Sequence, residues 1–342
     1  MYVSLKDVAE RAGVSFQTVS KVLNGRKATV SDATRERIMA AAAELGYVPN
    51  ALARGLVKQS TYTIGIVADS FDDWFLSQFV VGAELEARNR DHSILVSTEA
   101  GGAAAEQGQG YAQSLLERRV DGLIAAAPSA EEDEKAAQVL RSRLPAVAIH
   151  HVPGGGVPVV GSSHSATGRI AAEHLLLLGH RRIGSITGPS RRRVTESRMR
   201  GFRSALEAAG IAYPDSAWTA EADWSAEGGY RATAQLLARA PELTALHVHS
   251  DMMATGALAA LADAGRDVPS DCSVIACDDL PFSGYLRPPL TTVRIPARRS
   301  GERAVELLLD LIERKPVGDP PKDKVFLPVE LVARHSTAPP RS

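Results

Sequence analysis

The stretch GVSFQTVSKVLNG, residues 13–25, combines side chains that can read the edges of DNA bases. If this stretch is helical, Gln17 and Lys21 lie one turn apart on the same face. Glutamine can bond adenine through two atoms, lysine can reach O6 and N7 of guanine, and an aromatic edge such as that of Phe16 can pack on a thymine methyl group. The spacing therefore predicts a helix that reads bases in the major groove.

Small polar side chains accompany these three residues. Thr18, Ser20 and Asn24 are suited to contact phosphate oxygens, which position a protein on DNA without reading its sequence. Ser15, which can cap the helix, is also predicted to contact DNA. The alternative is a helix face that is polar only because water covers it.

The N-terminal segment favours three short helices. Ser4 followed by Asp7 is a capping-box start, and Gly13 ends the first helix. Further helices are predicted over 16–24 and 32–45. A helix, a turn with glycine and a second helix form the helix-turn-helix arrangement, whose second helix enters the major groove.

The same segment has a basic charge balance. Residues 1–60 contain nine Lys and Arg against five Asp and Glu, a net charge of +4, whereas the whole chain carries −1. The remaining residues are therefore acidic overall. A basic module on an acidic body favours contact with a polyanion through the N-terminal module alone.

From Thr61 onwards, apolar strand-like runs alternate with helical stretches. Strands are predicted over 62–69, 93–98, 120–127, 145–150, 157–161, 182–187, 245–250, 273–278 and 290–295. Helices are predicted over 76–90, 102–119, 165–179, 194–209, 226–239, 252–264 and 297–314. Buried strands that alternate with helices imply parallel sheets covered on both faces. Two such series predict two doubly wound α/β lobes, with a ligand site between them at the carboxyl ends of the strands.

Five segments resemble the LacI/GalR family of bacterial repressors, and the match runs from about residue 4 to about residue 333. They are LKDVAERAGVSFQTVSKVLNG, GYVPNALARGL, EADWSAEGGY, HSDMMATGALAAL and CDDLPFSGYLRPPLTTV. The reading helix departs from the family in two places. Phe16 lacks the hydroxyl of the tyrosine often found there, and Lys21 replaces the more usual arginine and loses its rigid fork.

The resemblance implies a helix-turn-helix head, a hinge helix and a core like that of type I periplasmic binding proteins. The expected parts are a DNA-binding domain over 1–49, a hinge helix and linker over 50–60, and an effector-binding and dimerisation core over 61–342. The first lobe is expected over about 61–161 and 292–320, and the second over about 162–291 and 321–336. Strands near 290–296 and 320–328 are expected to cross between the lobes.

The segment NALARGLVK at residues 50–58 predicts a weak helix that contains Gly55. A helix this short is only marginally stable in water, so we expect it to fold when two copies pack together on DNA. The resemblance implies DNA contacts from Asn50, Ala53 and Leu56, with Leu56 wedged into the minor groove to kink the duplex. Ordinary linker packing of Leu56 is the alternative.

Three residues of the second lobe stand where a ligand could be held. Arg198 matches the ligand-anchoring arginine of the family and supplies paired N–H donors. Asp278 ends a predicted strand and would accept bonds from hydroxyl groups, and Trp224 offers a flat face for a sugar ring. The alternatives are a surface ion-pair arginine, a helix-capping aspartate and a core tryptophan.

The resemblance places the other wall of the cleft in the segment DSFDDWFLSQF. Its predicted ligand residues are Asp73, Phe75, Leu76 and Phe79. Positions expected to hold polar or aromatic ligand contacts carry Ala126, His150, Ser162 and Ser250 in this chain. Because recognition of sugar hydroxyls depends on such buried partners, these departures favour a saccharide or glycoside in general over a galactoside.

Enzyme and metal functions find little support. The chain has no GxxxxGK[ST] and no GxGxxG segment, and GSSHS at 161–165 lacks the GxSxG spacing of a nucleophile elbow. His247 and His249 would share a strand face and could bind a metal, but no third ligand is evident. We expect neither catalytic residues nor a cofactor.

The chain also favours a cytoplasmic location. No run of about 18 apolar residues occurs, and the N-terminus lacks the apolar stretch of a signal peptide. Cys272 and Cys277 are expected to be reduced core thiols.

Together these patterns predict a cytoplasmic homodimeric repressor that binds a pseudo-palindromic operator in double-stranded DNA and is released by a small effector, a sugar or glycoside. The alternative is a regulator whose purine-like or other metabolite strengthens DNA binding. Helix 76–90, with Phe79, Val80 and Ala83 on one face, is a candidate dimer surface, although that face could equally pack on its own sheet.

Overall fold

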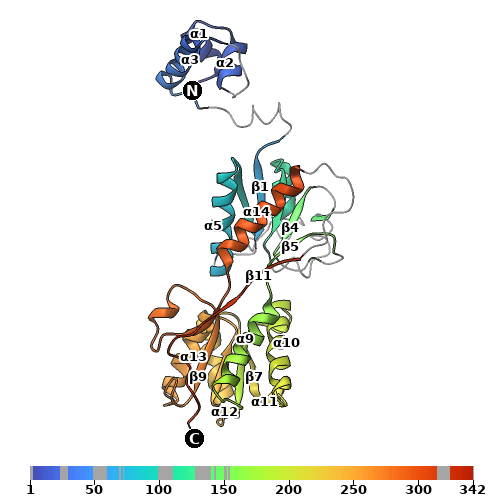
Figure 1. Cartoon of the computed structure of the whole chain (residues 1–342), viewed down its shortest axis with the longest axis vertical. Helices are drawn as coiled ribbons and strands as arrows, with labels where there is room; N and C mark the ends of the chain where they lie inside the picture. Colours follow the sequence, from blue (N-terminus) through green and yellow to red (C-terminus); the bar gives the residue numbers. More distant parts are fainter. Residues whose placement is uncertain are drawn as a thin grey trace. The chain divides into compact units, whose positions relative to one another are not determined.

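The computed structural model (Figure 1) describes residues 3–23, 30–48, 60–68, 71, 73–98, 111–127, 140–141, 144–149, 152, 155–313 and 324–341. The chain divides into two compact units. The first comprises residues 1–63 and 119–121, and the second comprises residues 64–118 and 122–342.

The first unit contains the three predicted helices, α1 (Leu5–Ala12), α2 (Phe16–Leu23) and α3 (Asp32–Glu44). The capping box before α1 is formed: the Ser4 hydroxyl accepts from the backbone N–H of Asp7, and the Asp7 carboxylate accepts from the backbone N–H of Ser4 at 2.7 Å. Gly13 has φ +62° and ends α1 in the left-handed region that favours glycine. The predicted helix-turn-helix is therefore confirmed.

One aliphatic side chain from each helix forms the centre of this small core. Val8 of α1, Val19 of α2 and Ile38 of α3 are all fully buried. Burial of one apolar face per helix stabilises helices that are individually too short to persist in water.

The first unit also includes the chain just before the core. The Asp121 carboxylate accepts from the Ser60 hydroxyl at 2.7 Å, from the Thr61 N–H at 2.9 Å and from the Tyr62 N–H at 2.6 Å. One acidic side chain thus holds three consecutive residues at the entry to the first strand of the core.

The described part of the second unit contains two sheets of six strands each. The first sheet has the order β11-β5-β4-β3-β1-β2. Its strands are β11 (Lys324–Leu327), β5 (Val159–Ser162), β4 (Ala146–Ala148), β3 (Gly122–Ala125), β1 (Thr63–Ala68) and β2 (Ser93–Thr98). The pairings of β1 with β3, β3 with β4, β4 with β5 and β5 with β11 are parallel.

The second sheet has the order β12-β10-β9-β8-β6-β7. Its strands are β12 (Glu330–Val332), β10 (Thr291–Arg294), β9 (Ser273–Asp278), β8 (Ala245–Val248), β6 (Ile183–Thr187) and β7 (Thr219–Glu221). Five of them are parallel, and β12 runs antiparallel to β10.

Helices cover both sheets. On the first lobe, α5 (Trp74–Asn89) packs against α14 (Ala297–Glu313), as Figure 1 shows, and α7 (Tyr111–Glu117) follows β2. Gly82 and Gly301 allow the close approach, because a Cβ at Gly82 would lie 2.0 Å from the Arg298 carbonyl oxygen and one at Gly301 would lie 2.0 Å from the Phe79 carbonyl oxygen.

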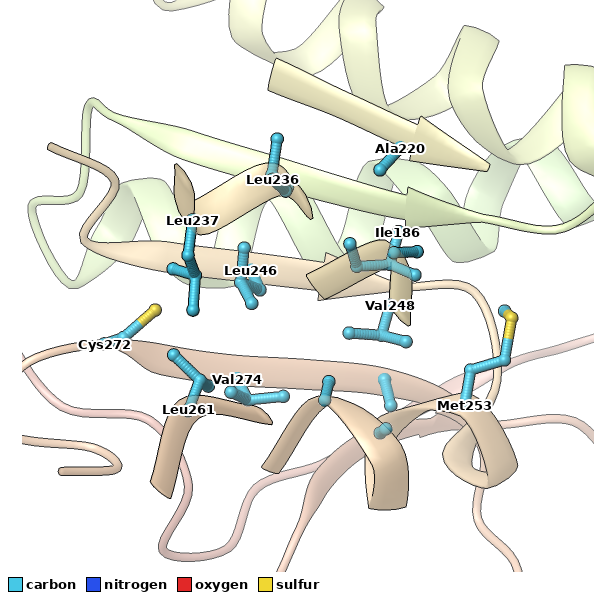
Figure 2. Close-up of a cluster of buried hydrophobic side chains, with 14 of the residues drawn as sticks. Ile186, Ala220, Leu236, Leu237, Leu246, Val248, Met253, Leu261, Cys272 and Val274 are labelled. Atoms are coloured by element: carbon cyan, nitrogen blue, oxygen red, sulfur yellow. The ribbon is translucent and has the colours of Figure 1, made fainter. Parts of the chain in front are cut away.

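On the second lobe, two helix pairs lie on opposite faces of the sheet. Alternate residues of β8 divide between them: Ala245 packs with α9 (His164–Leu177) and α10 (Arg193–Ala208), and Leu246 packs with α12 (Ala226–Arg239) and α13 (Asp251–Asp263). Figure 2 shows the hydrophobic cluster on the α12 and α13 side of this sheet, with Leu246 and Val248 of the sheet facing Leu236, Leu261 and Met253 of the helices. The predicted two-lobe α/β core is confirmed.

Two lobe boundaries require correction. The strand over 324–327, expected in the second lobe, pairs with β5 in the first sheet, and the strand over 291–294, expected mostly in the first lobe, pairs with β9 in the second sheet. Strand pairing is decided by partners far away in the chain, which the local pattern of a short strand does not identify. The sequence also did not predict α11 (Asp215–Trp218), β7, the 3-10 helix η2 (Ser283–Tyr285) or the antiparallel β12.

The apolar face of α5 packs inside its own lobe. Phe79 and Ala83 are fully buried in the first-lobe core, and Val80 packs against the same core. Of the two alternatives for this face, packing on its own sheet is therefore correct for these three residues.

Candidate functional site

The reading helix α2 separates its buried and exposed residues as the sequence predicted. Val19 and Val22 are buried, whereas Gln17 and Lys21 are exposed and Phe16 is 48% exposed. The side chains predicted to meet base edges thus share the open face of the helix.

The hydroxyl residues of α2 lie at its start and along its side. The Ser15 hydroxyl accepts from the Thr18 N–H at 3.2 Å and lies 2.9 Å from the Thr18 hydroxyl, so it caps the helix. Ser15 is exposed, and Thr18 and Ser20 are half-buried. The predicted DNA contacts Asn24, Asn50, Ala53 and Leu56 lie outside the described residues.

The three second-lobe residues predicted to hold a ligand come together at the carboxyl end of the second sheet. Arg198 of α10 is buried, and one of its terminal nitrogens donates to the His249 carbonyl oxygen. Its other terminal nitrogen lies 3.5 Å from Asp278 Oδ1, and the guanidinium carbon lies 5.9 Å from the ring centroid of Trp224. The cluster therefore combines a cation, a carboxyl group and an aromatic face.

Trp224 is held in an unusual position. Its φ of +70° lies in the left-handed region, which a bulky side chain rarely adopts. A Cβ at Gly188 would lie 2.0 Å from the Trp224 ring, so the ring occupies the space that this glycine leaves free. Such a backbone outlier is typical of a functional position.

Asp278 ends β9 and begins a tight change of direction. Its φ is +116°, and that of the following residue, Asp279, is +60°. Burial raises the pKa of Asp278 well above its usual value, and the neighbouring Arg198 opposes the rise. Asp279, which the sequence did not single out, accepts from Arg294 at 2.7 Å and from Arg334 at 2.6 Å and so fixes this turn.

Asp251 is a second buried carboxyl group that the sequence analysis missed. It accepts from the Leu280 N–H at 2.8 Å, the Ser283 hydroxyl at 2.5 Å and the Thr292 hydroxyl at 2.6 Å. Burial raises its pKa to about 6. These bonds join the start of α13 to the loop after Asp278 and to β10, and so position the carboxyl side of the cluster.

The hydroxyl groups of two other predicted ligand residues, Ser250 and Ser162, differ in their hydrogen bonding. Ser250 caps α13 by accepting from the Met253 N–H at 3.1 Å. Ser162, at the end of β5, is buried, and its hydroxyl has no hydrogen-bond partner among the described residues. His150 lies outside the described residues.

The predicted first-lobe wall is mostly core. Leu76, Phe79 and Ala126 are buried in the first-lobe cluster, so in this conformation Phe79 and Ala126 offer no exposed surface to a ligand. Phe75 is half-buried and packs against the hydrophobic clusters of both lobes. Asp73 caps α5 by accepting from the Leu76 N–H at 3.2 Å.

His247 and His249 form a fully buried pair whose ring centroids lie 4.9 Å apart. His247 also stacks on Phe202 at 4.7 Å. Burial, with Arg198 nearby, lowers the pKa of His247 to about 3, and the pKa of His249 is also well below its usual value. Within the described ranges, no group of three His, Cys, Asp or Glu side chains could hold a metal ion.

The depressed pKa of His247 predicts a specific loss of stability in acid. Unfolded histidine titrates near pH 6.5, whereas folded His247 stays neutral to about pH 3, so between these values the unfolded state binds one more proton. The free energy of unfolding of the wild type should therefore fall more steeply than that of His247→Leu, with a relative difference of about 2 kcal/mol accumulated between pH 6.5 and 5.

Denaturant unfolding at several pH values and one protein concentration measures this difference. The raised pKa values of Asp251 and Asp278 act in the opposite direction, but they are present in both proteins and largely cancel in the comparison. Parallel pH curves for the two proteins would contradict the assignment of a neutral His247.

A helix-turn-helix head joined to a two-lobed α/β core, with a polar and aromatic cluster at strand ends, defines the class of ligand-responsive DNA-binding regulators. Residues 4–50 match the family described as bacterial regulatory proteins, lacI family, and residues 172–337 match the periplasmic binding protein-like domain. The chain belongs to the LacI family of transcriptional repressors; it is not an enzyme.

Individual proteins agree with this assignment along the whole chain. The lactose operon repressor of Escherichia coli strain K12 is 35% identical over 99% of this chain and 92% of that protein. The HTH-type transcriptional repressor PurR of Haemophilus influenzae is 31% identical over 97% of this chain and 98% of that protein. A solved structure of the lac repressor dimer bound to operator and the anti-inducer ONPF has a TM-score of 0.87 and 34% identity, covering 99% of this chain and all of that one.

None of the described helices has the length and apolar character that crossing a membrane requires.

Proposed function

We propose that this chain acts in the cytoplasm as a homodimeric repressor that binds a pseudo-palindromic operator and releases it when a small neutral saccharide or glycoside binds the core. The proposal that an effector binds the core is supported by one observation: Arg198, Trp224 and Asp278 lie close together at the carboxyl ends of the second-lobe strands. Ligands of open α/β sheets bind at such strand ends.

The chemistry of this cluster suits a saccharide. A sugar ring has apolar C–H faces that stack on an indole such as Trp224. Its hydroxyl groups can accept from the Arg198 guanidinium and donate to or accept from the Asp278 carboxyl group. The lactose operon repressor is named for a sugar-utilisation operon, which supports a saccharide as the class of effector to test first.

A dimer follows from the proposed mode of DNA recognition. Each helix-turn-helix head reads one half-site, so two heads related by a two-fold axis read a pseudo-palindrome. The solved lac repressor, which is similar to this chain over nearly its whole length, is a dimer bound to operator.

The proposed link between effector and DNA is the hinge at 50–58, which lies outside the described residues. The Asp121 carboxylate holds residues 60–62, directly after this hinge, at the entry to the first lobe. Because Arg198, Trp224 and Asp278 belong to the second lobe, the effector must act by changing how the two lobes sit on each other. That change would separate two paired hinge helices and weaken operator binding.

Effector binding and operator binding are linked, so the effector weakens DNA binding if it prefers the released state and strengthens DNA binding if it prefers the DNA-bound state. A fluorescence-anisotropy titration of an operator selected from random duplexes tests both. The additions are lactose, cellobiose, D-ribose and a set of nucleobases. Release by a saccharide supports the proposal, and tighter DNA binding with a nucleobase, or catalytic turnover of any addition, would overturn it.

For DNA recognition, Lys21→Ala should weaken operator binding by roughly 1–3 kcal/mol and relax the preference at one base pair, because it removes a donor to a base edge. Binding to random DNA should change much less. Operator and random duplexes titrated at one salt concentration measure the two losses.

Lys6→Ala is the matched control, since Lys6 is an exposed lysine of α1 outside the reading helix. It should leave the ratio of operator to random binding unchanged. Equal losses of Lys21→Ala on both kinds of DNA would refute a base-reading role for Lys21.

A further inference from the structure

His249 is a buried polar side chain without the hydrogen bonds that burial normally requires. Its side chain is fully buried, and neither Nδ1 nor Nε2 has a partner among the described residues. Buried polar atoms are hydrogen-bonded in the large majority of cases, and each exception calls for an explanation. The imidazole could have been replaced by an apolar group at no loss of bonding.

His249 contacts both the core histidine His247, at 4.9 Å between ring centroids, and Arg198 of the effector cluster. Its carbonyl oxygen accepts from Arg198, and the Nε of the same Arg198 is a further buried atom with no partner in the described structure. One turn earlier on α10, the buried Thr195 hydroxyl also has no hydrogen-bond partner within the described ranges. Thr195 and Arg198 of α10 and His249 after β8 thus each have at least one buried polar atom with no hydrogen-bond partner among the described residues.

His249 lies at the edge of the second sheet where the proposed effector site is. His249 follows the last residue of β8, Val248, at the same sheet edge where β9 ends in Asp278. The Asp278 side chain keeps 17% of its surface exposed, whereas His249 keeps none. His249 therefore lies deeper than Asp278 at the same edge of the sheet.

His247 shows what a structural histidine looks like in the same strand. It is equally buried, but its ring stacks on Phe202 and its Nδ1 lies 3.5 Å from the Ser185 hydroxyl. Neither nitrogen of His249 has a hydrogen-bond partner of this kind in the described part of the chain. Among the described residues, His247 leaves only its Nε2 without a partner, whereas His249 leaves both ring nitrogens without one.

We propose that His249 is a ligand-contacting residue that determines effector specificity by hydrogen bonding to two hydroxyl groups of a neutral saccharide, one at each ring nitrogen. This inference rests on the proposed function and names a contact within it. A neutral imidazole has one N–H donor and one acceptor nitrogen, which match one hydroxyl that accepts and one that donates.

The charge of the site further restricts the ligand. Burial, together with His247, Arg198 and His164, lowers the pKa of His249 well below its usual value, so its ring is neutral at physiological pH. A neutral ring carries no positive charge to attract a phosphate group, and its donor and acceptor match uncharged hydroxyl groups. The site therefore favours an unphosphorylated saccharide.

Isothermal titration calorimetry on the full chain tests the proposal with lactose, cellobiose, D-ribose, D-glucose and D-glucose 6-phosphate as probes. For whichever neutral saccharide binds the wild type, His249→Leu should weaken binding roughly 10- to 100-fold, because two hydrogen bonds are lost. His249→Gln, whose amide keeps a donor and an acceptor, should recover part of the loss. Operator affinity without saccharide should stay unchanged in both variants.

His247→Leu is the matched control. It should keep the saccharide affinity of the wild type while lowering the melting temperature, since it removes the stacking on Phe202. His249→Leu should leave the melting temperature of the ligand-free protein unchanged or raise it, because it removes unpaired polar atoms from the interior.

The possible results distinguish a failure of the role of His249 from a failure of the proposed saccharide effector. If the wild type binds a neutral saccharide and His249→Leu binds it equally well, the role of His249 is wrong while the proposed function stands. A fall in melting temperature for His249→Leu as large as that for His247→Leu would make His249 a structural residue and also overturn the inference. If only the phosphorylated sugar or no probe binds the wild type, the neutral-saccharide effector fails, and this inference fails with it.

Discussion

Replacing Arg198 with alanine should abolish the response to effector while leaving operator binding nearly intact. The Arg198 guanidinium lies 3.5 Å from Asp278 Oδ1 and 5.9 Å from the Trp224 ring centroid, and charge-assisted hydrogen bonds of the kind it can make contribute about 1.5–3 kcal/mol each. Losing two of them predicts a fall in effector affinity of at least about 100-fold. The measurement is an operator titration at increasing concentrations of a saccharide that releases the wild type.

Arg200→Ala provides the matched control for this variant. Arg200 lies on the same helix but is exposed, with an ion pair to Glu196 at 3.7 Å, and surface pairs of this kind contribute little. Its replacement should change neither effector affinity nor operator affinity. The prediction that Arg198 serves effector binding and not operator binding is wrong if Arg198→Ala binds its effector normally. It is also wrong if the folded dimer of this variant no longer binds the operator.

Asp251→Ala should be the most destabilising single change in the second lobe that we predict, by about 3–5 kcal/mol in the free energy of unfolding. The substitution leaves one backbone N–H and two hydroxyl groups without their acceptor inside the protein. It also releases the loop after Asp278 and β10, so effector affinity should fall as well. Denaturant unfolding together with calorimetric titration measures the two effects.

Asp263→Ala is the comparison for this change. Asp263 lies at the other end of α13, is exposed, and accepts from the Tyr230 hydroxyl at 2.9 Å, its only side-chain bond among the described residues. Its loss should change stability by less than about 1 kcal/mol. Similar stabilities of the two variants would show that the three bonds to Asp251 contribute far less than their burial implies.

The head of the molecule could be predicted from its sequence in detail because its signals are local. Ser4 and Asp7 form the expected capping box, Gly13 takes up the expected left-handed conformation, and α2 exposes the expected face. Each of these features depends on residues within one or two helical turns. The predicted DNA contacts themselves remain predictions.

The second-lobe cluster was predicted by motif, and the structure adds its geometry. Arg198, Trp224 and Asp278 are far apart in the chain, and their meeting follows from a parallel sheet that brings strand ends to one edge. The ligand contacts of the first-lobe wall remain predictions. Phe79 and Ala126 are apolar residues on a buried helix face and at a buried strand end, and only packing decides whether such residues face a core or a cleft.

By itself, the sequence determined the class of this protein: a helix-turn-helix head, two α/β lobes and the residues of a polar cluster between strands and helices. Tertiary structure alone decided which sheet receives β10 and β11, because strand pairing joins residues distant in sequence. It also decided the surroundings of Asp251 and His249. Both are polar residues in the same short segment, yet burial gave Asp251 three hydrogen-bond donors and left both ring nitrogens of His249 without a partner in the described structure. Local sequence does not encode that difference, because the partners of a buried polar group come from other parts of the fold.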